Sequence, residues 1–368
     1  IVLNITDKKD CTGCFACANI CPQDCISMES DPEGFWYPQI DREKCTDCGC
    51  CEEVCPILQK RQAKSRPIAY ACYNNDENVR KDSSSGGIFT LLAEKAMDQG
   101  GIVFGVCFDD DFTVLHSRAE KKEELQKFRG SKYAQSHIGT TFSQAKEILD
   151  TGKKVMFTGT PCQIAGLKSY LQKDYDNLFC VDIICHGVPS PMVWQKYKQY
   201  RRSIDEAVPC SISFRHKKEG WKRFAVQFQY ADSTEYVQPF TKDFYMKAFL
   251  KNVCLRPSCY ACHFKSLQRE SDVTLADFWG VQELMQDMDD DRGTSLIFVH
   301  SEKGKELLER IKNNMVLKEV DIIKAVAYNL SAIRSAENNP NREKFFEELD
   351  TIPFDELYLK YCAKSADS

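Results

Sequence analysis

The class of this protein is decided by the segment Cys11-Thr12-Gly13-Cys14-Phe15-Ala16-Cys17-Ala18-Asn19-Ile20-Cys21-Pro22. The same spacing of cysteines is repeated in the segment Cys45-Thr46-Asp47-Cys48-Gly49-Cys50-Cys51-Glu52-Glu53-Val54-Cys55-Pro56. Both segments place four cysteines at the spacing C-x2-C-x2-C-x3-C, and a proline follows the fourth. Thiols at three-residue steps let a tight loop wrap one face of a metal cluster, and the proline turns the chain away after the last donor.

This spacing is the one with which bacterial ferredoxins hold two 4Fe–4S clusters, the fourth cysteine of each run reaching across to the other cluster. It predicts two sets of ligands: Cys11, Cys14, Cys17 and Cys55 for one cluster, and Cys45, Cys48, Cys51 and Cys21 for the other. A zinc ribbon or a reduced thiol-rich core is the alternative, but zinc sites usually use two C-x2-C pairs separated by a long gap. We interpret two further cysteines in this part, Cys25 and Cys50, as spectators rather than ligands.

Length and composition restrict the classes of protein that fit this sequence. The chain has 368 residues, and its 49 basic and 54 acidic residues give a net charge of −5 without a basic stripe. A nucleic-acid partner is therefore not expected, and the lack of an apolar run of about 18 residues predicts no membrane span. Twenty cysteines would suggest disulfides in a secreted protein, but cluster ligands must stay thiolates, so we expect a cytoplasmic protein.

A polar, basic connector at 59–67 separates the two cysteine runs from the remainder of the chain. Beyond it, apolar strands alternate with helices, which is typical of a parallel or mixed sheet covered by helices. We expect strands at 102–108, 154–158, 178–184 and 296–299, antiparallel strands at 211–216 and 223–230, and helices at 87–98, 141–149, 162–171, 191–200, 302–313 and 342–349. The predicted fold class is α+β and α/β: a dicluster-ferredoxin domain at 1–65, a mixed-sheet α/β region at 66–205, and the rest of that core, with a helical end, at 206–368.

Single cysteines follow two of the predicted strands. Cys162 comes shortly after the strand at 154–158, and Cys185 follows the strand at 178–184. In a parallel sheet such strand ends emerge on one edge, and neighbouring strands lie about 5 Å apart. With the pair Cys259 and Cys262 they make four donors, enough for a third 4Fe–4S cluster. A structural zinc on the pair, buried free thiols at the strand ends, and Cys254 as a competing donor stay open.

Iron–sulfur clusters pass single electrons, whereas most organic substrates exchange two. A flavin could connect the two, because it accepts a hydride and releases single electrons. The chain has no G-x-G-x-x-G fingerprint after a strand and no phosphate loop of the G-x4-G-K-[ST] type. The best anion cradle is Ser83-Ser84-Ser85-Gly86-Gly87 at a predicted helix start, although a plain helix cap explains it equally well. Arg129-Gly130-Ser131-Lys132-Tyr133 and the polar loop at 291–295 are further candidates.

Several motifs match one family in combination: Gly159-Thr160-Pro161-Cys162-Gln163, Cys185-His186-Gly187, the pair Cys259 and Cys262 leading to Leu275-Ala276-Asp277-Phe278-Trp279-Gly280, and Ser85-Gly86-Gly87. The chain resembles the coenzyme F420 hydrogenase/dehydrogenase beta-subunit family, fused to a dicluster ferredoxin. The resemblance implies FAD bound by the α/β region, a nearby 4Fe–4S cluster, and hydride exchange at the flavin. It favours Cys162, Cys185, Cys259 and Cys262 over a set with Cys254. The implied flavin contacts are Ser85, Gly86, Gly87, Ser131, Lys132, Tyr133 and Thr160.

The leading hypothesis is an oxidoreductase with three 4Fe–4S clusters and FAD. It would exchange a hydride or an electron pair with a small organic substrate, either coenzyme F420-like or another reducible compound. A ferredoxin-like or other redox protein is the expected partner, and a homo-oligomer stays open. No catalytic residue is assigned, since His186 is as well explained by a hydrogen bond near the third cluster. The rival hypotheses are an electron-relay subunit without an organic substrate and a structural thiol-metal protein.

Overall fold

The computed structural model describes residues 7–61, 63 and 66–363. Parts of the predicted connector, at 62 and 64–65, lie outside the described residues, as do the outer ends of the first and last predicted domains. The N-terminal unit contains two short helices, α1 (Ala16–Ile20) and α2 (Cys50–Glu53), and an antiparallel hairpin of β1 (Ile26–Ser30) and β2 (Trp36–Ile40). Each of these helices lies within one of the two cysteine runs. Because α1 contacts α2, the two runs lie next to each other.

The centre of the molecule is an eight-stranded sheet in the described part of the chain, with the order β13-β3-β12-β11-β7-β6-β4-β5. Its strands are β3 (Ile68–Asn74), β4 (Ile102–Phe108), β5 (Val114–Ala119), β6 (Val155–Thr158), β7 (Leu178–Ile183), β11 (Val273–Asp277), β12 (Ser295–Val299) and β13 (Met315–Val320). Strands β3, β11, β7, β6 and β4 share one direction, and the other three run opposite to it. The carboxyl ends of five strands therefore meet at one edge, where α/β proteins place their ligands.

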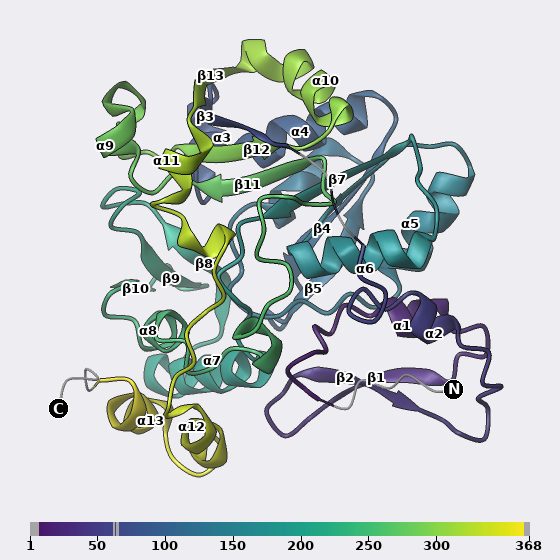
Figure 1. Ribbon diagram of the computed structural model, residues 1–368. Coiled ribbons are helices and arrows are strands. Elements are labelled where there is room, and N and C mark those ends of the chain that lie inside the picture. Colours follow the sequence, from purple (N-terminus) through teal and green to yellow (C-terminus); the bar gives the residue numbers. More distant parts are fainter. Residues whose placement is uncertain (1–6, 62, 64–65, 364–368) are drawn as a thin grey trace.

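Helices cover both faces of this sheet (Figure 1). On one face, α4 (Ile88–Asp98) packs against α10 (Glu302–Ile311) over a shared apolar core. On the other face lie α5 (Thr141–Asp150) and α6 (Pro161–Leu171). The N-terminal unit docks on this second pair, because α1 contacts both α6 and α5 and its residues belong to the same apolar cluster.

A second layer extends the core beside the N-terminal unit. It contains the antiparallel sheet of β8 (Pro209–His216), β9 (Ala225–Tyr230) and β10 (Glu235–Pro239), with α7 (Pro191–Asp205) and α8 (Phe244–Leu250). Aromatic rings fill the space between them, including Trp194, which lies 4.9 Å from Phe214 between ring centroids. The remaining helices are α3 (Glu77–Asp82), α9 (Val281–Leu284), α11 (Ile322–Val326), α12 (Arg342–Glu348) and α13 (Phe354–Tyr361).

The mixed α/β architecture and the helical C-terminal end are confirmed. Strand β4 has the predicted bounds, and α4, α5, α6, β6, β7 and α12 end within two residues of them. The antiparallel pairing of β8 with β9 is also confirmed. Of the strands in the main sheet, β3, β5, β11 and β13 were not predicted, and the sheet takes strands from both sides of the predicted division at 205/206. No helix among the described residues is long and apolar enough to cross a membrane.

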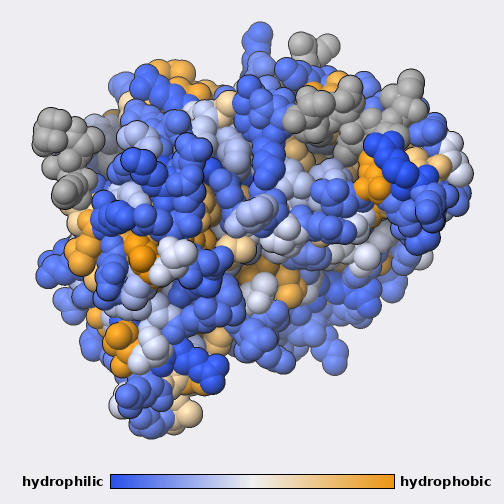
Figure 2. Space-filling view, turned by 90° about the horizontal axis from the view of Figure 1, so that it is seen from below, coloured by the Kyte–Doolittle hydropathy of each residue, from blue (hydrophilic) through white to orange (hydrophobic). Residues whose placement is uncertain are grey.

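The surface seen from below in Figure 2 is mostly hydrophilic, and hydrophobic residues form small scattered patches there. Among the most exposed large apolar side chains, Ile323 lies in α11, Ile204 at the end of α7, and Val208 in the short loop after it. Scattered apolar residues of this kind are normal on a folded surface.

Candidate metal centres

The thiols predicted for the first cluster lie together in the structure, and we call them the proximal group: Cys11, Cys14, Cys17 and Cys55. Three of them are buried and Cys14 is half-buried. Burial raises the pKa of Cys14 to about 12, and the neighbouring Cys55 and Cys11 thiols add to the rise. The proximal group therefore combines three cysteines of the first run with the last cysteine of the second run, as the spacing predicts.

The thiols predicted for the second cluster line one hollow of the N-terminal unit, and we call them the distal group: Cys21, Cys45, Cys48 and Cys51. Cys48 is exposed, so this hollow opens to solvent. Cys25 and Cys50 also line it, and the Sγ atom of Cys25 is 3.3 Å from the Sγ atom of Cys21. Both cysteines thus contact the predicted site, and whether they are spectators stays a prediction.

A second hollow gathers the four thiols of the core group: Cys162, Cys185, Cys259 and Cys262. Burial raises the pKa of Cys259 to about 12 and lifts the pKa of Cys162 well above its ordinary value. Cys254 is fully buried beside Cys362 and does not line this hollow. Of the two sets left open by spacing, the structure brings together the one without Cys254.

Two features of the backbone bring the core group to one place. Strands β6 and β7 are parallel neighbours, as expected, and Thr158 pairs with Val181 near their ends. Helix α6 follows β6 at once, capped by Thr160, whose hydroxyl lies 3.1 Å from the Sγ atom of Cys162. Gly187 allows the segment after Cys185 to approach the Cys259 loop, because a Cβ atom there would lie 2.8 Å from the Cδ1 atom of Leu255.

Cations surround the core hollow. Arg256, Lys265 and Arg269 line it together with His186. The Nζ atom of Lys265 donates to the carbonyl oxygens of Ser331, at 2.9 Å, and of Cys185. Four thiols in a hollow lined by cations fit an anionic iron–sulfur cluster. Among the described residues, no three His, Cys, Asp or Glu side chains converge closely enough to hold a single metal ion.

His186 is held on both sides of its ring. Its Nε2 atom is 2.6 Å from the Oδ1 atom of Asn252, and its Nδ1 atom is 3.4 Å from the hydroxyl of Ser331. Burial lowers its pKa, which favours the neutral ring. These contacts orient His186 beside the core group without assigning it a proton-transfer role.

Two segments expected near a flavin lie side by side. The backbone N–H of Ser131 donates to the hydroxyl of Ser84 at 2.7 Å. Arg215 joins them, because its guanidinium donates to the hydroxyl of Tyr133 at 3.1 Å and to the carbonyl of Ser84 at 3.0 Å. The same guanidinium pairs with Asp277 on β11 at 2.8 Å. We call the two segments, 83–87 and 129–133, the serine loops.

The individual residues expected at the flavin have identifiable partners. The hydroxyl of Ser85 donates to the carbonyl of Thr294, and the N–H of Gly86 donates to the hydroxyl of Ser295, both at 2.9 Å. Gly87 caps α4 with φ +81°. Lys132 donates to the carbonyls of Arg129 and Gly130, and burial lowers its pKa to about 8. The hydroxyl of Thr160 contacts a thiol of the core group, and its role as a flavin contact stays a prediction.

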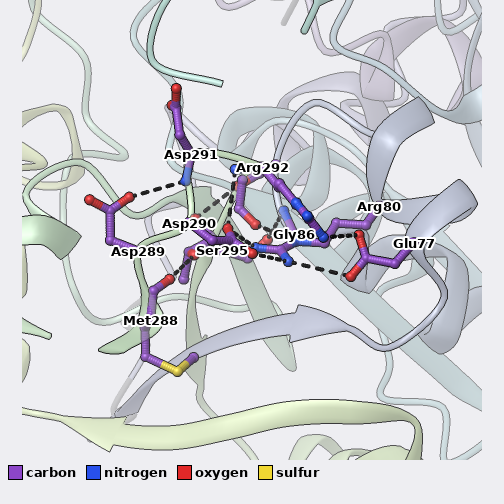
Figure 3. A network of polar contacts seen from close by, with 12 residues as sticks. Glu77, Arg80, Gly86, Met288, Asp289, Asp290, Asp291, Arg292 and Ser295 are labelled. Atoms are coloured by element: carbon purple, nitrogen blue, oxygen red, sulfur yellow. Dashed lines mark hydrogen bonds and ion pairs between the residues drawn. The ribbon is translucent and has the colours of Figure 1, made fainter. Parts of the chain in front are cut away.

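A network of polar contacts links the first serine loop, at Gly86, to the segment 288–295 (Figure 3). Arg80 makes a two-pronged ion pair with Asp290, at 2.7 and 2.6 Å, and Arg292 pairs with Glu77 at 3.1 Å. Lys217 donates to the carbonyl of Arg80 at 2.6 Å. Sequence reasoning singled out the loop at 291–295, but it missed Arg80, Arg215 and Lys217, because their partners are distant in the sequence.

Comparisons with known proteins find matches to three family models and to a solved structure. The family model for the N-terminal part of the coenzyme F420 hydrogenase/dehydrogenase beta subunit matches residues 69–142, and the model for its C terminus matches residues 152–325. A 4Fe–4S dicluster domain model matches residues 10–57. Among solved structures, the chain is similar to a chain of the F420-reducing NiFe hydrogenase complex from Methanosarcina barkeri, with 17% identity, a TM-score of 0.48, and coverage of 77% of this chain and 98% of that one.

None of the curated proteins compared with the chain matches it. The three family models cover the N-terminal unit and most of the core, and all four cysteines of the core group lie within the residues matched by the C-terminal model. The chain therefore belongs to the coenzyme F420 hydrogenase/dehydrogenase beta-subunit family, with a 4Fe–4S dicluster domain in front of the family's two parts.

Proposed function

We propose that this chain is an iron–sulfur flavoprotein oxidoreductase. Its proximal, distal and core groups each hold one 4Fe–4S cluster, and the serine loops hold FAD. Electrons pass between the N-terminal clusters and the flavin through the core cluster. The organic substrate is coenzyme F420-like or another reducible compound that exchanges a hydride or an electron pair.

One observation carries this proposal: helix α6 touches both the proximal and the core groups. Cys162 lies in the first turn of α6, and Gly166 lies four residues later, on the same helix face. A Cβ atom on Gly166 would lie 2.9 Å from the Sγ atom of Cys14. Thr12, from the loop of the proximal group, also lines the core hollow. Residues 162 and 166 are about one helical turn apart, so clusters held by these two groups would lie near each other, which would suit electron transfer.

The chemistry of the serine loops supports a flavin beside these centres. The Nε atom of Arg215 is buried, and none of the described residues accepts a hydrogen bond from it. A buried donor of this kind calls for an acceptor that is absent from the protein itself. FAD, when bound, supplies carbonyl acceptors and the exchange between single electrons and a hydride. Arg215 would bind it, and Asp277 would orient the guanidinium.

Anaerobic purification with iron, sulfide and flavin assays tests the proposal. We expect about twelve iron atoms per chain, from three four-iron clusters, and one flavin. About eight iron atoms would remove one cluster from the proposal. An absent flavin would remove the flavoenzyme function and leave the clusters.

A second candidate is an electron-relay subunit without an organic substrate of its own. The exposed Cys48 of the distal group favours it, because a cluster near the surface can exchange electrons with a docked redox protein. Turnover by the isolated chain with a reduced deazaflavin and a dye would contradict the relay function. Electron uptake that requires a partner protein, without such turnover, would support it.

A further inference from the structure

Arg256 lies fully buried where the N-terminal unit meets the core, and its contacts reach across the boundary. Its Nε atom donates to the carbonyl of Cys11 at 2.8 Å, and its Nη2 atom donates to the carbonyl of Trp36 at 3.0 Å. Its Nη1 atom donates to the Oε1 atom of Gln135 at 3.1 Å. The guanidinium carbon also lies 4.2 Å from the centre of the Tyr37 ring. All these partners are neutral.

No carboxylate in the described part of the chain forms an ion pair with Arg256. The other deeply buried arginines each have one: Arg80 pairs with Asp290, Arg215 with Asp277, and Arg269 with Asp182. A buried guanidinium without a counter-charge is strongly unfavourable, since a unit charge taken out of water loses its hydration. Arg256 therefore needs a negative charge that the side-chain carboxylates do not provide.

Two predicted cluster sites, whose thiolates and clusters would be negative, lie in contact with Arg256. The Nη2 atom of Arg256 is 3.6 Å from the Sγ atom of Cys11, in the proximal group. Arg256 also lines the hollow of the core group, and its carbonyl accepts a hydrogen bond from the N–H of Cys259 at 2.9 Å. The distal hollow, by contrast, is lined by no lysine or arginine among the described residues.

We propose that Arg256 is the shared counter-ion of the proximal and core clusters and sets the reduction potentials of both. The inference rests on the proposed function, in which these two groups hold 4Fe–4S clusters. Reduction adds one electron to a cluster and makes it more negative, and a fixed positive charge beside it stabilises that state. Arg256 thus raises both potentials together and leaves the distal potential unchanged. The distal cluster is the internal reference.

The test is a potentiometric titration of the whole purified protein, followed by electron paramagnetic resonance. The three signals are first assigned with Cys14→Ala, Cys48→Ala and Cys259→Ala, which remove one ligand from the proximal, distal and core sites. In Arg256→Met we expect the proximal and core potentials to fall and the distal potential to stay. The expected change is at least about tenfold in the ratio of reduced to oxidised cluster, equal to about 59 mV for a one-electron couple.

Two further variants separate charge from shape. Arg256→Lys keeps the positive charge, so we expect both potentials to stay near those of the unmodified protein. Gln135→Glu keeps the shape and the arginine but adds a carboxylate next to the guanidinium, so both potentials should again fall. If Arg256→Met fails to assemble its clusters, the potentials of Gln135→Glu still test the proposal. Arg201→Met, which removes a buried arginine paired with Asp205 away from the cluster sites, is the control and should shift nothing.

The possible results are distinguishable. Equal shifts of all three potentials, an effect of Arg256→Lys as large as that of Arg256→Met, or unchanged potentials in Gln135→Glu would each overturn the role of Arg256. An unmodified protein without about twelve iron atoms would instead remove the proposed function on which the inference rests.

Discussion

The N-terminal unit and the core build their cysteine sites in opposite ways. The proximal and distal groups come from two short runs, 11–21 and 45–55, whose spacing already predicts which thiols belong together. The core group takes single cysteines from two strand ends and a pair almost 75 residues beyond Cys185. Its geometry depends on the pairing of β6 with β7 and on the loop at 254–262. A change in the main sheet should therefore leave the proximal and distal groups in place. The same change should move the cysteines of the core group apart.

The largest effect is expected from Arg269→Met, which removes a buried ion pair next to the core group. Arg269 pairs with Asp182 at 3.3 Å and donates to the carbonyl of Ile183 at 2.8 Å, just before Cys185. Burial raises the pKa of Asp182, and the Arg269 charge opposes that rise. Arg269→Met leaves this carboxylate buried and unpaired, which typically costs about 3–5 kcal/mol. We expect this loss in urea unfolding, together with loss of the core iron and retention of the N-terminal iron.

Arg118→Met is the matched control, because Arg118 and its partner Glu120 are both about half exposed. Exposed ion pairs contribute about 0–1 kcal/mol, so stability and iron content should stay close to those of the unmodified protein. Equal losses in the two variants would show that the core group does not depend on the buried pair.

A pair of glycine substitutions sharpens the comparison. A Cβ atom on Gly187 would lie 2.8 Å from Leu255, beside the core group, and one on Gly166 would lie 2.8 Å from the Cβ atom of Cys14, in the proximal group. Overpacking of this kind typically costs about 1–3 kcal/mol. We expect Gly187→Ala to lose the core iron and Gly166→Ala to lose the proximal iron. Iron and sulfide assays check this, and loss of the same cluster in both variants would contradict it.

The smallest expected effect concerns Lys132 in the second serine loop, a local segment that the fold brings against the distant segment 83–87. Burial lowers the pKa of Lys132 to about 8, below its ordinary value of 10.5. Between these two pH values the unfolded chain holds a proton that the folded protein has released, so stability gains from Lys132 as the pH rises. We expect the stability of the unmodified protein to improve relative to Lys132→Met across this window.

Lys132→Arg is the control for that measurement, because arginine keeps its charge throughout the window. The difference in stability between Lys132→Arg and Lys132→Met should not change with pH. A stability gap between the unmodified protein and Lys132→Met that is flat from about pH 8 to about pH 10.5 would contradict a lowered pKa.

Local patterns predicted much of the fold and which of the N-terminal thiols lie together. The buried strand β4 was predicted with its full bounds because all of its residues but Gly105 are apolar, and the N-terminal cysteine sets followed from spacing alone. Strand β13 lies at the sheet edge and carries Lys318 and Glu319, so it has no continuous apolar signal. Arg256 and Arg215 could not be found, because their roles depend on partners that only the folded chain brings near.

The central claim is that the core group is a cluster site assembled from distant cysteines, and paired substitutions test it most directly. Cys259→Ala and Cys254→Ala remove neighbouring thiols, of which only Cys259 lines the core hollow. After anaerobic purification, we predict about eight iron atoms in Cys259→Ala, with the proximal and distal clusters intact, and about twelve in Cys254→Ala. Unchanged iron in Cys259→Ala, or loss of a cluster in Cys254→Ala, would contradict the account.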